Sequence, residues 1–231
     1  VIFAGKAASS YRMAKTIIRL IHDVAQVVNN DPRIANRLKV VFIPNYGVSV
    51  AETIMPGADL SEQISTAGTE ASGTGNMKLS MNGALTIGTD DGANIEIRQA
   101  VGDDNIFIFG LKTPEVAALE QSGYHSDTAL HNNPVLQGVI DAIAGGVFSP
   151  DEPGRYTELV DSLMGSKDRY FLLADHASYV AAQQRVDDLY QRSDDWTRCA
   201  IANVAAMGVF SSDHTIAQYA HNIWNVNGSP T

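Results

Sequence analysis

The sequence is poor in cysteine and in basic residues. Cys199 is the only cysteine among 231 residues, so an internal disulfide framework is excluded, and one thiol with dispersed histidines cannot form a structural zinc site. There are 16 Lys and Arg residues against 26 Asp and Glu residues, a formal net charge of −10. No basic cluster is present that could follow a phosphate backbone or an anionic bilayer. Nucleic acid and membrane surfaces are therefore not expected as partners.

Long apolar runs are also missing. No run approaches the roughly 20 residues that span a bilayer, and no basic segment followed by a hydrophobic signal core opens the sequence. Together with the single cysteine, these absences lead us to expect a soluble, cytoplasmic protein. The chain opens on VIFAG, an apolar run that predicts a buried strand of a parallel sheet and has no leading methionine. We therefore expect it to be a portion of a larger protein.

The residues that are present suit a globular domain. Hydrophobic residues make up 45% of the chain and charged residues 18%, which excludes disorder, collagen and coiled coil. A chain of this length can bury roughly 70–75% of the surface that its unfolded form exposes. That is enough for one large domain or two small ones.

The first 110 residues alternate strand-like and helix-like patterns. A strand, an amphipathic helix and a second strand follow one another from residue 1 to residue 43, the order of a crossover unit in a parallel sheet. Strands are expected at residues 1–4, 38–43, 58–65, 84–87 and 106–109. We predict a doubly wound, mostly parallel α/β sheet of the Rossmann type, with ligands bound beyond the carboxyl ends of its strands.

From residue 111 to residue 231 the pattern is mainly helical and is expected to complete the same domain. Thr113-Pro114 and Asn133-Pro134 are typical helix starts, with a capping side chain followed by proline. The segment 212–224 is an amphipathic helix with an aromatic stripe that requires a docking surface. No strand is expected in this half.

The most informative stretch is STAGTEASGTGNMK, residues 65–78. Gly73 and Gly75 let the main chain approach a ligand closely, and the N–H groups at the start of the following helix favour an anion. Lys78 lies four positions after Thr74, one helical turn or about 6 Å further along. An anion and a reactive amine together suit pyridoxal phosphate, which carries a phosphate and an aldehyde. A surface lysine behind a flexible glycine turn remains an equal alternative from patterning alone.

Two general motifs fail here. Gly73 to Lys78 begins like the dinucleotide fingerprint G-x-G-x-x-G, but Lys78 stands where the third glycine is needed. Gly5-Lys6 resembles the end of a P-loop, but Ala7 replaces the Ser or Thr that would hold magnesium.

Other candidate sites have simpler interpretations. The run Asp90 to Asn94 lacks the ligand order and closing Glu of a calcium loop, so a strand-to-helix turn with an Asp cap is favoured. His22 and His214 are predicted at helix surfaces, and no metal site is expected. Trp196 and Trp224 are predicted as core or docking residues.

Several long motifs resemble those of the α-glucan phosphorylases, the glycogen, starch and maltodextrin enzymes. They are EASGTGNMK from Glu70, NGALTIGTDDGANIEI from Asn82, VIFAGKA from Val1, ADLSEQIST from Ala58 and FSSDHTIAQYAHNIW from Phe210. The resemblance implies the carboxy-terminal domain of a GT-B fold, with the amino-terminal domain missing from this chain. It also implies a homodimer for the intact protein and a last helix that crosses back to the missing domain.

The resemblance assigns roles to the residues of the loop. Lys78 would form the Schiff base with pyridoxal phosphate, and Thr74 and Gly75 would hold its phosphate. A second loop beside the cofactor would comprise Tyr46, Gly47 and Val48; many family members have a basic residue at the position of Gly47. The hydroxyls of the transferred glucosyl unit would bind Glu70, Ser72 and Gly73. Asp90 occupies a position at which an apolar residue is common in the family.

The resemblance implies reversible phosphorolysis, in which inorganic phosphate releases glucose 1-phosphate from an α-1,4-glucan with retained configuration. Contacts to substrate phosphate would come from the missing domain, so we expect the chain alone to be inactive. Two rivals are a noncatalytic glucan- or anion-binding module and a nucleotide-sugar glycosyltransferase of the same architecture. Lys78 separates the enzyme from the binding module, because a pure binding module has no need of an aldehyde-reactive amine. The glycosyltransferase is disfavoured because the resemblance runs through the lysine-bearing loop itself.

Overall fold

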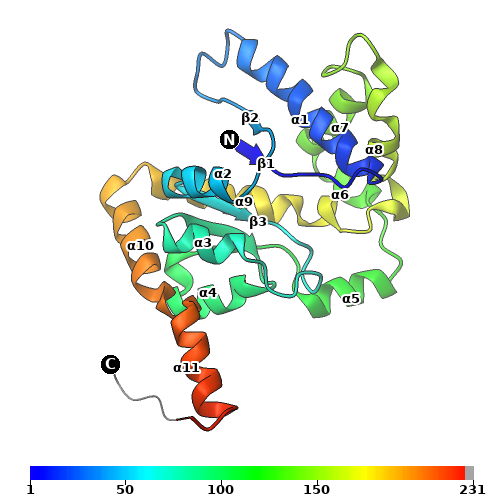
Figure 1. Ribbon diagram of the computed structural model, residues 1–231. Coiled ribbons are helices and arrows are strands. Elements are labelled where there is room, and N and C mark those ends of the chain that lie inside the picture. Colours follow the sequence, from blue (N-terminus) through cyan, green and yellow to red (C-terminus); the bar gives the residue numbers. More distant parts are fainter. Residues whose placement is uncertain (227–231) are drawn as a thin grey trace. The chain divides into compact units, whose positions relative to one another are not determined.

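A computed structural model describes residues 1–226 and divides the chain into two compact units (Figure 1). The first unit comprises residues 1–51 and 121–174, and the second comprises residues 52–120 and 175–231, described as far as residue 226. Each unit is therefore assembled from two separate stretches of the sequence. Both contain parallel strands and helices, and helices predominate in the described chain.

In the first unit, strand β1 (Ile2–Ala4), helix α1 (Arg12–Asn30) and strand β2 (Val41–Ile43) form the predicted crossover. The two strands are parallel, with Ile2 paired to Val41. The prediction that β1 is buried is wrong, because Ile2 is 59% exposed. Among the described residues β1 pairs only with β2, so both strands of this short sheet are edge strands and neither has a neighbouring strand on both sides.

The rest of the first unit is helical. Helices α6 (Asp127–His131), α7 (Pro134–Ala144) and α8 (Thr157–Asp161) surround a small apolar core. The core residues are Leu130, Leu136, Ile140, Val160 and Leu173. Asn133 caps α7 by accepting a hydrogen bond from the Leu136 N–H at 3.0 Å, as the Asn-Pro pair predicted.

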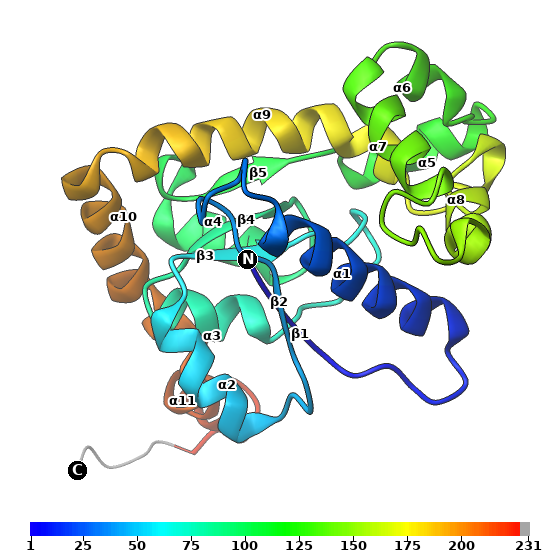
Figure 2. The same cartoon turned by 90° about the horizontal axis from the view of Figure 1, so that it is seen from above.

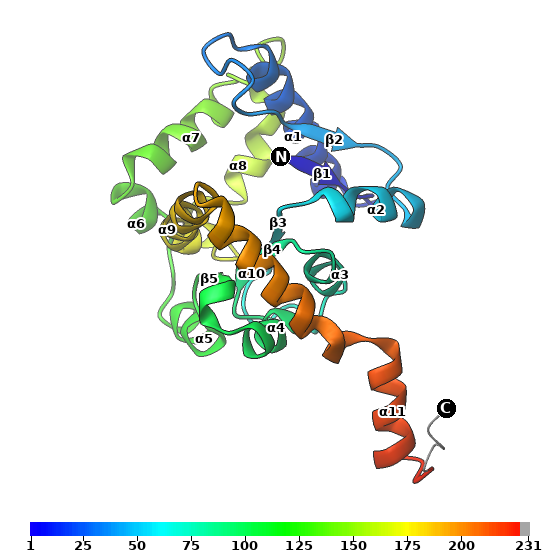
Figure 3. The same ribbon diagram turned by 90° about the vertical axis from the view of Figure 1, so that its left-hand side faces the viewer.

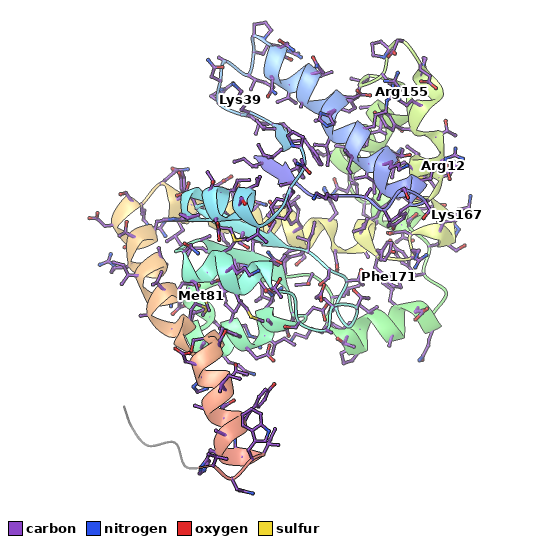
Figure 4. All side chains as sticks on the ribbon, viewed as in Figure 1. Arg12, Lys39, Met81, Arg155, Lys167 and Phe171 are labelled. Atoms are coloured by element: carbon purple, nitrogen blue, oxygen red, sulfur yellow. The ribbon has the colours of Figure 1, made fainter. Side chains whose placement is uncertain are left out.

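Charged groups connect α1 to the segment that precedes α8. Arg155, labelled in Figure 4, has a side chain only 10% exposed and forms an ion pair with Asp23 of α1 at 2.8 Å. The hydroxyl of the fully buried Tyr156 donates to the same carboxylate. Burial and this neighbouring carboxylate raise the pKa of Tyr156 to about 12. The phenol therefore stays protonated and acts as a donor at neutral pH.

In the second unit, strands β3 (Leu60–Gln63), β4 (Leu85–Thr89) and β5 (Phe107–Phe109) form a parallel sheet in that order. One face packs on helices α9 (Leu172–Tyr190) and α10 (Ser193–Ala206), where Leu85, Phe107 and Trp196 share one core. The other face carries helices α3 (Gly75–Met81) and α4 (Ala93–Val101). Figure 2 shows the sheet between α9 and α3.

Side chains of the strands alternate between these two layers. Leu85 and Ile87 face the core with α9, whereas the Thr86 hydroxyl lies 3.3 Å from the Ser80 hydroxyl of α3. This alternation is the period of two that a strand requires. The three-stranded sheet therefore has helices on both faces, as the predicted doubly wound sheet does. The five described strands nevertheless form two small sheets.

The remaining helices are α2 (Val48–Ile54), α5 (Thr113–Gln121) and α11 (Ser212–Asn222). The part of the chain that the structure describes also contains five short 3-10 turns: η1 (Met55–Gly57), η2 (Asp103–Asn105), η3 (Pro153–Tyr156), η4 (Gly165–Lys167) and η5 (Met207–Phe210). Between residues 113 and 226 there is no strand, as predicted.

Figure 3 shows α11 extending from the end of α10 within the second unit. The helix ends two residues earlier than the predicted 212–224, so Trp224 follows it. The aromatic side chains of the predicted stripe are exposed, with Tyr219 at 44% and Trp224 at 56%. Trp196, in contrast, is a core residue. None of the helices over residues 1–226 is long and apolar enough to cross a membrane.

Candidate functional site

The candidate site lies where two neighbouring parallel strands of the second unit end. β3 ends at Gln63, which is paired with Gly88 near the end of β4. Because the carboxyl ends of parallel strands meet at one edge, the loop after β3 (residues 64–74, the site loop) lies beside the residues after β4 (91–94, the DGAN segment). The Thr89 hydroxyl joins them by donating to the Ser65 carbonyl at 2.6 Å. The predicted position of the site, beyond the strand ends, fits this arrangement.

Asp91 holds the first half of the site loop. Its side chain is buried, with the residue 5% exposed. Oδ1 accepts the Gly68 N–H at 2.9 Å, and Oδ2 accepts the Ser65 hydroxyl at 2.8 Å and the Glu70 N–H at 2.9 Å. Burial acts to raise the pKa of Asp91, but these hydrogen bonds outweigh it and hold the pKa below the ordinary value. Donors of the loop itself therefore stabilise a buried carboxylate.

The Ser72 carbonyl anchors the second half of the loop. It accepts the Ala93 N–H at 2.7 Å and the Asn76 side-chain amide at 3.2 Å. Asn76 is 2% exposed, and its amide also donates to Asn94 Oδ1 at 3.1 Å. Gly92 permits this contact, since it has φ +50° and an added Cβ would lie 2.7 Å from the Ser72 carbonyl oxygen.

The corner at residues 73–75 presents main-chain donors. Gly73 has φ +81°, and Thr74 precedes α3 without a side-chain capping bond. Within residues 1–226, the N–H groups of Thr74, Gly75 and Asn76 have no protein acceptor. Consecutive N–H groups of this kind attract an anion. The corner can therefore bind a phosphate without displacing any protein hydrogen bond to these three donors.

Lys78 lies one turn beyond this corner, and its N–H donates to the Thr74 carbonyl at 3.3 Å. Its side chain is exposed, although its helix is partly buried through Asn76 and Ser80. The amine is therefore available to a ligand on the open side of α3. Glu70 is also exposed, and its Oε1 accepts the Ser72 N–H at 3.4 Å, a long contact that a ligand hydroxyl could replace.

The structure thus brings six of the predicted site residues onto one continuous loop and helix start. They are Glu70, Ser72, Gly73, Thr74, Gly75 and Lys78. The other three, Tyr46, Gly47 and Val48, belong to the first unit at the start of α2. Val48 is 77% exposed there.

One local prediction is wrong. An Asp cap was expected at the start of α4, but the N-cap residue is Gly92 and no side chain caps this helix. The Asp91 carboxylate is directed to the site loop instead, because three loop donors converge on it.

Sequence reasoning also missed the supporting roles of Asp91, Asn76 and Asn94. The available signal was a run of Asp and Asn directly after a buried strand. Residues 1–226 contain no group of three His, Cys, Asp or Glu side chains able to hold a metal ion.

The lowered pKa of Asp91 leads to a pH prediction. Since the folded-state pKa lies below the ordinary value, the stabilisation is fully present above the ordinary aspartate pKa and is lost as the pH falls through the folded-state pKa. We expect the Gly68 and Glu70 amide resonances to shift together in an acid titration followed by NMR. In Asp91→Asn this shared transition should be absent. Its persistence in that variant would assign the transition to another group.

Comparison with known proteins identifies the family. The sequence model of the family described as carbohydrate phosphorylase matches residues 1–226, which include the site loop and Lys78. The glycogen phosphorylase of Haemophilus influenzae is 55% identical over 225 residues, 97% of this chain and 27% of that protein. The Synechocystis glycogen phosphorylase is also 55% identical over 225 residues, 97% of this chain and 26% of that protein. The brain form of glycogen phosphorylase from Bos taurus is 52% identical over 224 residues, which cover 97% of this chain and 26% of that protein. The chain spans about a quarter of the length of these relatives, and with a match over nearly its whole length it belongs to the carbohydrate phosphorylase family.

Proposed function

We propose that this chain supplies the cofactor-binding half of an α-glucan phosphorylase. The intact enzyme would carry out reversible phosphorolysis of α-1,4-glucans to glucose 1-phosphate, with retained configuration. The observation that carries the proposal is the family match over residues 1–226, which includes a glycine corner with unpaired donors and a lysine one turn beyond it. Among the described residues, the N–H groups of Thr74 and Gly75 have no protein acceptor and the Lys78 amine has no carboxylate partner.

The residues of the corner suit pyridoxal phosphate. The N–H groups of Thr74 and Gly75, with the Thr74 hydroxyl, would hold the phosphate, and the exposed Lys78 amine would hold the aldehyde carbon covalently. When bound, the cofactor would supply its phosphate as a proton-exchanging group next to the substrate phosphate. Lys78 would then act as an anchor, because the reacting proton lies at the phosphate end. Tyr46, Gly47 and Val48 are proposed to line the cofactor from a second loop.

Glu70, Ser72 and Gly73 are proposed to bind the transferred glucosyl unit. Glu70 offers a carboxylate that accepts hydrogen bonds from sugar hydroxyls, and Ser72 and Gly73 offer main-chain N–H donors. A sugar hydroxyl would replace the 3.4 Å contact between the Ser72 N–H and Glu70. The N–H groups of the loop carry partial positive charge, which would offset the repulsion between the cofactor phosphate and the substrate phosphate.

The rest of the enzyme is part of the proposal. We propose that the chain is the carboxy-terminal domain of a GT-B fold, with a Rossmann-like core in residues 1–110 completed by residues 111–231. The active site would form against an amino-terminal domain of the same enzyme, and the intact protein would form a homodimer. Relatives about four times as long are consistent with such an additional domain.

A chimera tests the function. This chain would replace the matching region of the Haemophilus influenzae enzyme, with which it shares 55% identity. We expect the chimera to release glucose 1-phosphate from maltodextrin and phosphate in a pyridoxal-phosphate-dependent manner, while the 231-residue chain alone does not. A correctly folded, cofactor-loaded chimera without turnover would contradict the proposal. Turnover by the chain alone would contradict the requirement for a second domain.

A further inference from the structure

We propose that Asp91 is a positioning residue for glucosyl binding, and that it acts on the sugar side of the site loop separately from the cofactor corner. The inference rests on the proposed function above. Asp91 has no predicted contact with sugar or cofactor. It would act through the main chain of Gly68 and Glu70, whose N–H groups it accepts at 2.9 Å each.

The site loop has little burial to fix its shape at this point. Thr66 and Ala67 are buried, but Gly68, Thr69 and Glu70 are exposed. Exposed loop residues are held chiefly by hydrogen bonds rather than by packing. Other hydrogen bonds here join Thr69 to the Thr66 carbonyl, from its N–H at 3.0 Å and from its hydroxyl at 2.7 Å, and the Ser72 N–H to the Glu70 carboxylate at 3.4 Å. The Asp91 carboxylate therefore positions the main chain from which the Glu70 side chain extends.

The hydrogen bonds of Asp91 divide the loop into two parts. Its three donors in the site loop, on Ser65, Gly68 and Glu70, all precede residue 71. The cofactor corner is connected through the Ser72 carbonyl, which Ala93 and Asn76 hold. Removing the Asp91 charge should therefore disturb sugar contacts while leaving the phosphate donors of Thr74 and Gly75 in place.

Asp91→Asn is the direct test, because it keeps the side-chain volume but replaces one acceptor oxygen by an NH₂ donor that must face a loop N–H. Asp90→Asn is the matched control. It removes the same charge one position earlier, but the Asp90 carboxylate faces Arg98 at 3.0 Å and not the loop. Both variants are to be made in the chimera and in the 231-residue chain.

In the chimera, we expect Asp91→Asn to lower kcat/KM for glucose 1-phosphate by roughly 10- to 100-fold, the effect of losing a charged hydrogen-bond network. The KM for glucose 1-phosphate should rise, while cofactor content and borohydride-fixed adduct on Lys78 remain at the parent level. Asp90→Asn should stay within about 2-fold of the parent, as substitutions away from the site do. Unchanged kcat/KM in Asp91→Asn, or equal losses in both variants, would overturn the inference.

Two further outcomes separate the inference from the function on which it rests. Loss of cofactor in Asp91→Asn along with activity would overturn the separate action of Asp91. An inactive parent chimera without an adduct on Lys78 would count against the proposed function instead. In that case NMR of the 231-residue chain still tests whether Asp91 positions the Gly68–Glu70 part of the loop separately from the cofactor corner. Asp91→Asn must shift the Gly68 and Glu70 amides and leave those of Thr74 and Gly75 unmoved, and any other pattern overturns it.

Discussion

Replacement of Lys78 by alanine in the chimera should reduce phosphorolysis by at least about 10³-fold, because the variant loses covalent retention of the cofactor on which all turnover would depend. The effect should appear in kcat and in cofactor content together. Steady-state kinetics after gel filtration, with a phosphate assay of the retained cofactor, measures both. Because Lys78 is exposed on α3, its replacement by alanine removes no buried packing, and the variant should fold normally.

Two controls accompany this variant. Lys78→Arg keeps the positive charge beside the corner but cannot form the covalent link, so it should be as inactive as Lys78→Ala. Lys112→Ala removes another exposed lysine of the same unit and should leave turnover unchanged. Activity of Lys78→Arg near the parent level would show that a cation at this position suffices, contrary to the proposed anchor.

Substitution of Gly92 by alanine should destabilise the second unit by roughly 1–3 kcal/mol, the cost of a side chain in a backbone conformation restricted to glycine. Gly92 has φ +50° and ψ −144°, and its added Cβ would lie 2.7 Å from the Ser72 carbonyl oxygen. Relief of that clash requires the site loop to move away from the DGAN segment. The hydrogen bond from the Ala93 N–H to Ser72 would then be lost as well.

Gly102→Ala is the matched control for this substitution. Gly92 and Gly102 flank the same helix, α4, and Gly102 has φ +83° with no atom within 4 Å of an added Cβ. The control therefore measures backbone strain without the clash. Denaturant unfolding followed by tryptophan fluorescence reports on the second unit, which contains both tryptophans of the chain, Trp196 and Trp224. Equal destabilisation by the two substitutions would contradict a role for the Ser72 contact.

Much of the local structure could be predicted from the sequence because it depends on local patterns. The crossover from β1 through α1 to β2 follows from periodicity, and the Asn133 cap of α7 follows from capping chemistry. The exposure of β1 could not be predicted, since an apolar run does not reveal how many neighbouring strands cover it. Pairing partners are a property of the assembled sheet.

In the candidate site, too, local features could be predicted from the sequence and features that depend on strand pairing could not. The composition of the loop indicated an anion near Lys78, and the structure contains unpaired donors at that corner. The Asp91 carboxylate was assigned to its own helix because capping is a local rule, but its donors come from residues 65–70, more than 20 positions earlier in the sequence. Only folding of β3 beside β4 brings these groups together.

Borohydride reduction of the 231-residue chain incubated with pyridoxal phosphate, followed by peptide mapping, shows which lysine binds the cofactor aldehyde. We expect a stable pyridoxyl adduct concentrated on Lys78, with Lys112 and the other exposed lysines modified only at background level. Inorganic phosphate should compete with the cofactor at the corner formed by residues 73–75. Modification spread evenly over the surface lysines would contradict the proposed role of Lys78.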